Sequence, residues 1–288
     1  MTAFRLACVQ VNAGDDMAAN VAQASALARA ARAAGADLVA LPECVALMEP
    51  RRARVIELAA PEESHPALAA FRALARELDV WLLAGTVTVR TDEERVANRS
   101  CLIAPDGAVA ARYDKIHMFD VDLPGGESYR ESRTYRPGDA AVSAALPWGV
   151  LGMTVCYDVR FPHLYRALAR AGADFLSVPS AFTRQTGAAH WHVLLRARAI
   201  EAGAYVFAPA QCGEHPGKRL TYGHSLIVDP WGRVLADGGE APGFVVAELD
   251  TAEVAKARQA LPSLEHDRPF AAPAAMLRPG PSARRKSS

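Results

Sequence analysis

Three residue types that together can cleave an amide occur in this chain, each at the end of a run of strand-forming residues. Glu43 ends the segment LVALPE, Lys115 ends ARYDK, and Cys156 ends GMTVC. The carboxyl ends of strands in an open α/β sheet form one edge, where such sheets bind their ligands. We therefore expect a carboxylate, an ammonium group and a thiol to converge on one site.

These groups meet the needs of acyl transfer to a thiol. A free thiol has a pKa of about 8.5 and is mostly protonated at neutral pH, so Glu43 can act as its base and later return the proton to the leaving amine. Lys115 can stabilise the thiolate and the oxyanion, together with the backbone N–H of Tyr157. Taken singly, Glu43 and Lys115 are also typical of solvated loops, and Cys156 is typical of a buried core. The combination favours catalysis.

The elements that must position these groups alternate along the chain. Helical patterns occupy residues 15–35, 65–79, 161–171 and 188–203. Strand patterns occupy residues 4–11, 37–43, 80–89, 97–104, 108–115, 150–158, 173–180, 204–210, 223–229 and 244–249. A loop rich in glycine and proline is expected between the strands at 108–115 and 150–158. Hydrophobic strands between helices predict one α/β sandwich domain over residues 1–275, followed by a polar, basic and disordered tail at 276–288.

Composition excludes several classes of function. Lys+Arg and Asp+Glu both number 32, so no net charge attracts the chain to nucleic acid or anionic lipid. The five cysteines have no C-x-x-C spacing, which argues against a disulfide framework and a structural zinc site. No apolar run resembles a signal peptide or a membrane span. We expect a cytoplasmic protein that binds neither nucleic acid nor membrane.

Three segments resemble the signatures of a known family. LPE, YDKIHMFDVDLPGGESYRES and GMTVCYDVRFP are similar, in this order, to segments of the nitrilase superfamily, whose carbon–nitrogen hydrolases use a Glu-Lys-Cys triad. The resemblance spans residues 4 to about 270 and implies a four-layer α-β-β-α sandwich. It also implies a homodimer and no metal or organic cofactor. A second glutamate that assists catalysis in this family matches Glu131, with Glu127 as the second choice.

The resemblance also suggests a substrate. Nitrilases typically follow the nucleophile with tryptophan, whereas Tyr157 follows Cys156 here, which favours an amide. The segment AQCGEHPGKRLTYGHS is similar to the branch of deaminated glutathione amidases, which implies hydrolysis to 2-oxoglutarate and cysteinylglycine through a thioester. The alternatives are an ω-amidase acting on α-ketoglutaramate, an amidase or carbamoylase of another small substrate, and a catalytically silent binding protein.

A dianionic substrate calls for cations around the thiol. Arg160, Arg184, Lys218 and Arg219 are the candidates for binding its carboxylates, although basic loop residues are as often solvated or paired with acids. For Arg160 the alternative is an ion pair with Asp158. Three histidines, His190, His215 and His224, lie in the same segments and are equally consistent with packing. Cys212 is a rival nucleophile, but no glutamate and lysine pattern accompanies it.

Overall fold

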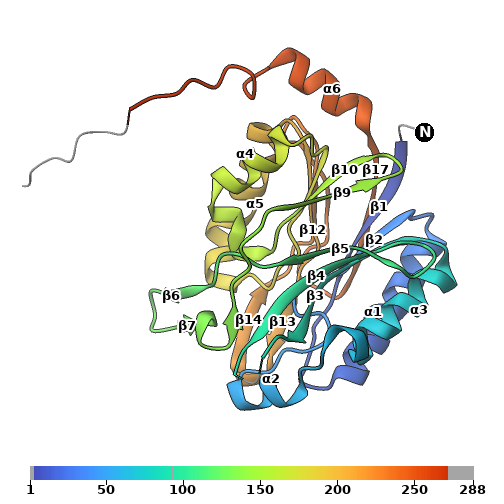
Figure 1. Cartoon of the computed structure of the whole chain (residues 1–288), viewed down its shortest axis with the longest axis vertical. Coiled ribbons are helices and arrows are strands. Elements are labelled where there is room, and N and C mark those ends of the chain that lie inside the picture. Colours follow the sequence, from blue (N-terminus) through green and yellow to red (C-terminus); the bar gives the residue numbers. More distant parts are fainter. Residues whose placement is uncertain (1–2, 93, 272–288) are drawn as a thin grey trace, which may run out of the picture.

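Two β-sheets packed face to face form the centre of the molecule, and helices cover the outer face of each sheet (Figure 1). The computed structural model describes residues 3–92 and 94–271. Helices α1 (Met17–Ala33) and α3 (Pro66–Leu78) lie on one side of the two sheets, and α4 (Pro162–Arg170) and α5 (Arg184–Ala202) lie on the other. The predicted four-layer α-β-β-α sandwich is confirmed. The expected tail at 276–288, and the domain limit at 275, lie outside the described residues.

The first sheet has the strand order β17-β1-β2-β3-β4-β5, with β8 pairing to β4. β1, β2 and β3 run parallel. β17 pairs antiparallel with β1, β4 pairs antiparallel with β3, and β5 pairs antiparallel with β4. The strands are β1 (Ala3–Gln10), β2 (Leu38–Ala40), β3 (Trp81–Arg90), β4 (Val96–Ile103), β5 (Val109–Asp114), β8 (Tyr135–Arg136) and β17 (Gly243–Asp250).

The second sheet has the order β16-β15-β12-β11-β10-β9, with a parallel centre formed by β10, β11 and β12. Its strands are β9 (Val142–Leu146), β10 (Gly149–Met153), β11 (Phe175–Ser177), β12 (Tyr205–Ala208), β15 (Leu226–Val228) and β16 (Val234–Asp237). Two hairpins stand apart from both sheets: β6 (Asp120–Asp122) with β7 (Ser128–Arg130), and β13 (Cys212–His215) with β14 (Arg219–Tyr222).

Helix ends follow local capping chemistry. Asp16 accepts the N–H groups of Ala18 and Ala19 and so starts α1, and Gly203 ends α5 with a φ of 54°. The α-helices of the described residues are α1 (Met17–Ala33), α2 (Arg52–Leu58), α3 (Pro66–Leu78), α4 (Pro162–Arg170), α5 (Arg184–Ala202) and α6 (Thr251–Ala260). None of them is long and apolar enough to cross a membrane.

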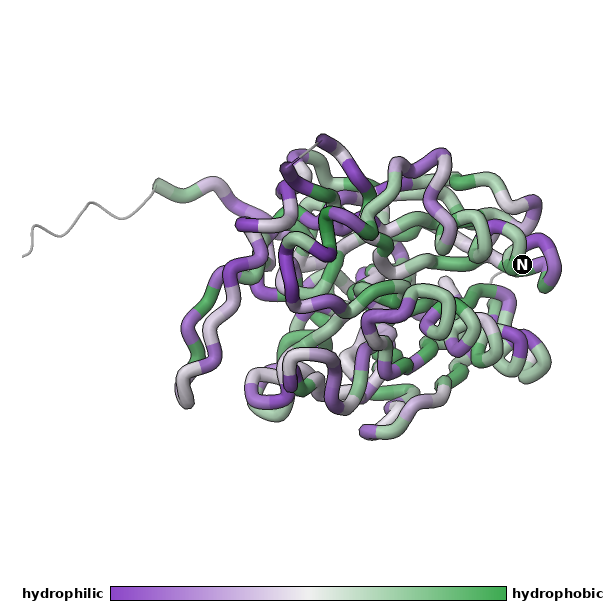
Figure 2. The backbone as a smooth tube through the Cα atoms, turned by 90° about the horizontal axis from the view of Figure 1, so that it is seen from below, coloured by the Kyte–Doolittle hydropathy of each residue, from purple (hydrophilic) through white to green (hydrophobic). Residues whose placement is uncertain are grey.

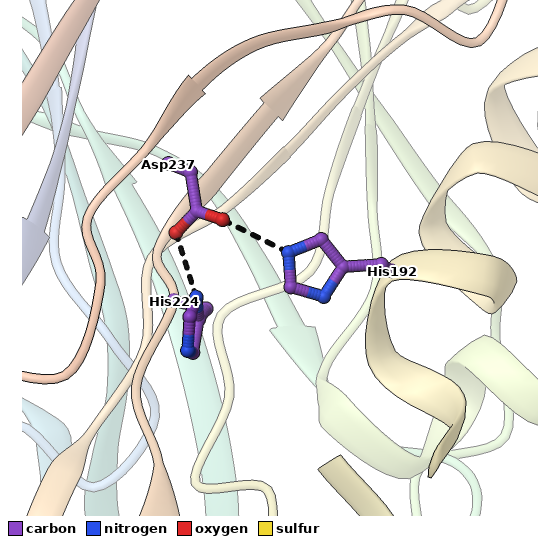
Figure 3. A group of neighbouring side chains, drawn as sticks. All are labelled: His192, His224 and Asp237. Atoms are coloured by element: carbon purple, nitrogen blue, oxygen red, sulfur yellow. Dashed lines mark hydrogen bonds and ion pairs between the residues drawn. The ribbon is translucent and has the colours of Figure 1, made fainter. Parts of the chain in front are cut away.

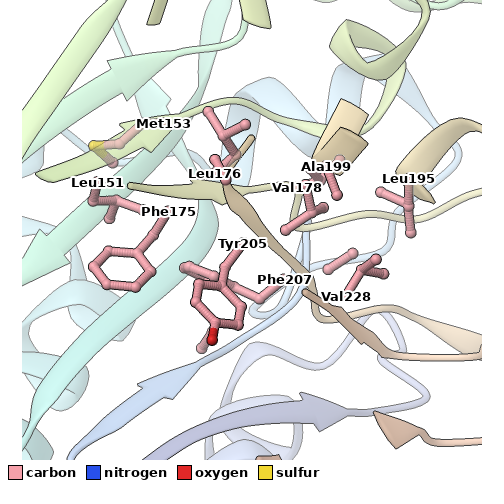
Figure 4. Close-up of a cluster of buried hydrophobic side chains, with 14 of the residues drawn as sticks. Leu151, Met153, Phe175, Leu176, Val178, Leu195, Ala199, Tyr205, Phe207 and Val228 are labelled. Carbon is pink, nitrogen blue, oxygen red and sulfur yellow. The ribbon is translucent and has the colours of Figure 1, made fainter. Parts of the chain in front are cut away.

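The two faces of the first sheet pack against different hydrophobic layers, one toward the second sheet and one toward α1 and α3. Along β1, Phe4 and Leu6 face the second sheet, whereas Ala7 and Val9 face α1 and α3. Phe4 stacks on Trp148 with ring centroids 4.2 Å apart. Figure 4 shows the second sheet's share of this core, where side chains of β10, β11 and β12 pack beside those of α5. The hydrophobic stretches gather inside the molecule, and most hydrophilic ones lie around it (Figure 2).

The structure adds elements that the sequence analysis did not predict. The segment between β5 and β10, expected as a loop, contains β6, β7, β8 and β9. Helices α2 and α6 and the β13–β14 hairpin were also missed. Most of these elements are short or lie at an edge, so they bury no continuous apolar face that a sequence pattern would reveal.

Candidate active site

Glu43, Lys115 and Cys156 meet at one end of the sheets, as the sequence analysis expected. They follow β2, β5 and β10 by three, one and three residues, respectively. Glu131, in a short 3-10 helix after β7, is the fourth member of the group. All four line the same cavity.

A buried ammonium group links the two carboxylates. Lys115 Nζ donates to Glu43 Oε1 at 2.9 Å and to the two carboxylate oxygens of Glu131 at 3.0 and 2.8 Å. Asn98 Nδ2 lies between the same two glutamates, 2.9 Å from Glu43 Oε1 and 3.2 Å from Glu131 Oε1. The N–H of Ala181 donates to Glu43 Oε2 at 2.8 Å. Glu43 is thus held by three N–H donors, which fix the orientation of its carboxylate.

Burial and the charges of this network determine which of Glu43, Lys115 and Cys156 are protonated in the resting site. Burial alone would raise the pKa of Glu43, but the charge and hydrogen bond of Lys115 outweigh burial and lower it. Burial would lower the pKa of Lys115, but the charges of Glu131 and Glu43 raise it well above its usual value. For Cys156, burial and the charge of Glu43 raise the pKa of the thiol, and Lys115 opposes them only in part. The resting site therefore combines a carboxylate base, an ammonium group and a protonated thiol.

Cys156 occupies a strained turn. Its φ of 48° lies in the left-handed region, which non-glycine residues seldom adopt. Its N–H donates to the carbonyl of Pro179 at 3.0 Å, and its thiol is a hydrogen-bond partner of Glu43. Only 7% of the residue is exposed. The turn thus holds the sulfur against its base at the floor of the cavity.

The carboxylate of Asp158 secures this turn. Its Oδ2 accepts the hydroxyl of Tyr113 at 2.7 Å and the N–H of Val155 at 2.8 Å. Its Oδ1 accepts the backbone N–H of His117 at 3.1 Å and contacts the ring Nδ1 of the same residue at 2.7 Å. Tyr113 and His117 lie on either side of Lys115 in the chain, and Val155 precedes Cys156. One fully buried carboxylate therefore fixes the turn of Cys156 relative to Lys115.

The amide after the nucleophile is available to an oxyanion. In the described chain the N–H of Cys156 donates to Pro179 and that of Asp158 to Val155, whereas the N–H of Tyr157 between them has no acceptor. The ring of Tyr157 packs against Phe119 and Phe161, which limits the movement of this peptide. The predicted oxyanion hole at Tyr157 is therefore sterically and chemically possible.

The cavity above the thiol has a volume of about 490 Å³, which is within the range of small-molecule sites. Besides Lys115, its cationic residues come from three separate segments: Arg52 on α2, Arg130 on β7, and the adjacent Lys218 and Arg219. Aromatic side chains contribute Phe119, Tyr129, Tyr135, Tyr157 and Phe182. The lining thus combines an aromatic wall with these cations and with the carboxylates of Glu43, Glu49, Glu127 and Glu131.

Two of the four cations predicted to bind substrate line the cavity, and two do not. Arg219 donates to the carbonyl of Ala181 at 2.7 Å, and its Nε is buried without a hydrogen-bond partner among the described residues. Lys218 lies beside it and is exposed. Arg184 is an exposed residue at the start of α5, outside the cavity lining.

Arg160 does not pair with Asp158, so that alternative was wrong. Its guanidinium group lies 5.2 Å from the ring centroid of Phe182 and 3.3 Å from Nδ1 of His190. Both carboxylate oxygens of Asp158 already accept hydrogen bonds from Tyr113, Val155 and His117, so neither is available to an arginine. Arg160 packs behind Phe182 and is absent from the cavity lining.

Of the other residues considered, His215 is buried between the carbonyl of Ala13 and the hydroxyl of Thr221, and burial lowers its pKa, so it supplies no cation. Glu127, the second choice for the assisting glutamate, accepts the hydroxyl of Tyr129 and does not contact Lys115.

Cys212, the rival nucleophile, is not part of the cavity lining. Burial raises the pKa of its thiol to about 11.

Several residues of the site were not predicted from the sequence. Asn98 is the most important, because it contacts both Glu43 and Glu131 from the middle of β4. Its buried position in a strand pattern was the available signal, since an asparagine among apolar strand residues needs a polar partner. Arg130 and Tyr129 were also missed, because they lie in the hairpin that the sequence analysis expected to be a loop.

Known proteins resemble this chain over nearly its whole length. The family model described as carbon-nitrogen hydrolase matches residues 5–259. A protein named deaminated glutathione amidase from Synechocystis sp. is 42% identical over 270 residues, covering 92% of this chain and 98% of the relative. The omega-amidase NIT2 from Homo sapiens is 34% identical over 268 residues, covering 93% of this chain and 96% of the relative.

A solved structure has the same fold. The NitFhit protein of C. elegans superimposes with a TM-score of 0.86 at 37% identity, and the match covers 93% of this chain and 66% of that protein. This chain therefore spans about two thirds of that longer protein. The fold, the matched family model and the sequence relatives agree with the resemblance to the nitrilase superfamily. This chain belongs to the carbon–nitrogen hydrolase family.

Proposed function

We propose that this protein is an amidase that hydrolyses deaminated glutathione to 2-oxoglutarate and cysteinylglycine. The observation that carries the proposal is the convergence of Cys156, Glu43, Lys115 and Glu131 at the floor of one cavity. The identity to relatives named deaminated glutathione amidase, 42% against 34% for the omega-amidase, supports this substrate over α-ketoglutaramate.

The first half of the reaction forms a thioester. Glu43 accepts the proton of the Cys156 thiol as the sulfur attacks the amide carbonyl, because the resting thiol is protonated and the carboxylate is its hydrogen-bond partner. The resulting oxyanion is stabilised by Lys115 Nζ and by the N–H of Tyr157. Glu43 then gives the proton to the amine of cysteinylglycine as the C–N bond breaks. The 2-oxoglutaryl group remains on the sulfur.

The second half releases the acid. A water molecule gives a proton to Glu43 and attacks the thioester carbonyl, and the C–S bond breaks as the proton returns to the sulfur. Glu131 has a supporting role, since it holds Lys115 through both of its carboxylate oxygens. Its Oε2 also accepts the N–H of Phe119, which ties the loop after β5 to the lysine.

The two rival substrates differ only in the amine that they release. Deaminated glutathione and α-ketoglutaramate would both leave the same 2-oxoglutaryl thioester on Cys156, so the second half of the reaction would be identical. Discrimination between them must arise in the first half, where cysteinylglycine or ammonia leaves. The cationic residues Lys218 and Arg219 are the proposed partners of the substrate carboxylates.

The substrate is tested by kcat/KM for the two amides, with Cys156→Ala as the inactive control. A preference of tenfold or more for deaminated glutathione, worth about 1.4 kcal/mol, supports the proposal. A preference for α-ketoglutaramate would reverse the assignment. Arg219→Gln should lower kcat/KM by about 10- to 100-fold, because a hydrogen bond to a charged group contributes about 1.5–3 kcal/mol. The matched variant Arg184→Gln, outside the cavity, should change kcat/KM by less than about twofold.

We further propose that the protein forms a homodimer through α5 and the β15–β16 hairpin. Large apolar side chains are exposed here: Val193 and Ile200 on α5, and Trp231, Val234 and Leu235 on the hairpin. The hairpin packs on the helix, where Arg196 Nε donates to the carbonyl of Gly232 at 2.7 Å, so the five residues belong to one surface. Sedimentation velocity should give a dimer that Trp231→Arg weakens, and a monomeric parent protein would contradict the proposal.

We also propose that the protein is located in the cytoplasm. The five cysteines of the described chain are free thiols, which supports a reducing compartment such as the cytoplasm. Fractionation of cells that express the full chain tests this prediction.

A further inference from the structure

We propose that His192, His224 and Asp237 form a binding site for a borderline divalent metal ion such as Zn²⁺, separate from the catalytic cavity. The carboxylate of Asp237 lies between the two imidazole rings (Figure 3). The donor atoms of the three residues all lie within 4.8 Å of one another, and none of the residues lines the cavity. Two imidazoles and one carboxylate are a donor set that suits Zn²⁺, with water in the remaining position. This site is independent of the proposed amidase function.

The carboxylate already gathers the two rings. His192 Nε2 lies 2.9 Å from Asp237 Oδ2, and His224 Nδ1 lies 2.8 Å from Asp237 Oδ1. These are the atoms that would bind the ion, and each ring would then carry its proton on its other nitrogen. Small movements of the side chains would let all three donors face one ion.

The supporting structure holds His224 in place before any ion binds. Its N–H donates to the carbonyl of Gly239 at 2.6 Å, and its carbonyl accepts Trp191 Nε1 at 2.8 Å. Its ring stacks on Tyr222 with centroids 4.4 Å apart. The φ of His224 is 54°, a backbone conformation that seldom occurs outside glycine and clusters at functional sites. Such a supporting shell fixes a ligand's orientation and is typical of metal sites.

The three ligands come from different elements, which gives the site a structural consequence. His192 lies on α5, Asp237 ends β16, and His224 lies just before β15. The Asp237 carboxylate also accepts the N–H of Gly239 at 2.9 Å. About a third of the His192 and Asp237 side chains and a fifth of His224 are exposed, so an ion and its water can reach them. A bound ion would join α5 to the second sheet.

Zinc binding is measured by calorimetry on the full chain in the Cys156→Ala background, so that an ion on the catalytic thiol is not counted. We expect one Zn²⁺ per chain. His192→Gln and Asp237→Asn should each weaken binding at least about tenfold. His266→Gln is the matched control, because His266 is an exposed histidine outside the cluster, and it should bind within about twofold of the parent.

Three results would overturn the site: no saturable binding up to millimolar Zn²⁺, equal affinity in the ligand variants, or half an ion per chain. The absorption spectrum of bound Co²⁺ adds a second readout. Histidine and carboxylate ligands give no thiolate charge-transfer band, whereas such a band would assign the ion to a cysteine and contradict the proposal. Circular dichroism of each variant confirms that the change in binding is not caused by unfolding.

Discussion

Replacing Asp158 by asparagine tests whether one buried carboxylate sets the geometry of the catalytic groups. The aspartate accepts hydrogen bonds at both oxygens, from Tyr113 and Val155 on one side and from His117 on the other. Asparagine has the same shape but only one oxygen. Its amide group would face donors on one of the two sides, and those donors would lose their acceptor.

The number of lost hydrogen bonds sets the expected change in the free energy of unfolding. Two hydrogen bonds to a charged group, at about 1.5–3 kcal/mol each, predict a loss of about 3 to 6 kcal/mol in the free energy of unfolding. This is a large part of the roughly 5–15 kcal/mol that stabilises a typical domain. Lys115 and Cys156 would shift relative to each other, and a misplacement of about 1 Å costs about 100-fold in rate. We therefore expect kcat to fall about 100-fold with KM changed far less.

The assay combines urea denaturation with steady-state kinetics on Asp158→Asn and Tyr113→Phe. The second variant removes one donor and leaves the carboxylate charged, so it should lose about 1.5–3 kcal/mol and stay folded. Graded losses of both stability and kcat across the two variants support the reasoning. An Asp158→Asn protein with the stability and kcat of the parent would refute it.

Two further predictions concern other carboxylates. Glu131→Gln should lower kcat about 100-fold because it loosens the catalytic ammonium group, whereas Glu127→Gln should change kcat less than about twofold; equal effects would contradict the assignment. For Glu62, burial is outweighed by hydrogen bonds from Arg112 and Arg99, and its pKa lies below the ordinary 4.5. Because the pKa of Glu62 is lower in the folded state, its carboxylate stabilises the fold at pH values above the ordinary 4.5. Glu62→Gln should therefore be less stable than the parent at pH 7. The difference should disappear as the pH falls below 4.5 in urea titrations at several pH values.

The layers and the convergence of Glu43, Lys115 and Cys156 could be predicted from the sequence because both depend on strong local patterns. The strands that carry Glu43, Lys115 and Cys156 have apolar runs that end abruptly, and strand ends share one edge of a sheet. The alanine-rich segment of α1, with Asp16 at its start, and the amphipathic segment of α3 also gave clear signals. Element type was therefore predictable where burial is continuous.

The missing parts depend on contacts between distant residues. Asp158 and Arg160 are two residues apart and of opposite charge, which made an ion pair an equal alternative to substrate binding by Arg160, but Tyr113 and His117 supply the partners of the carboxylate instead. Asn98 joins the site from 55 residues beyond Glu43. Local spacing carries no information on such pairs, so a single sequence could not reveal them.

The proposed mechanism requires a thioester on Cys156, which rapid-quench mass spectrometry of the intact protein can detect. We expect a transient mass increase equal to one 2-oxoglutaryl group, located by peptide mapping on Cys156. The same adduct should form from deaminated glutathione and from α-ketoglutaramate, and Cys156→Ala should form none. Glu43→Gln should form it far more slowly, because the protonated thiol would have no base. Turnover by the Cys156→Ala protein, or an adduct on another residue, would contradict the account.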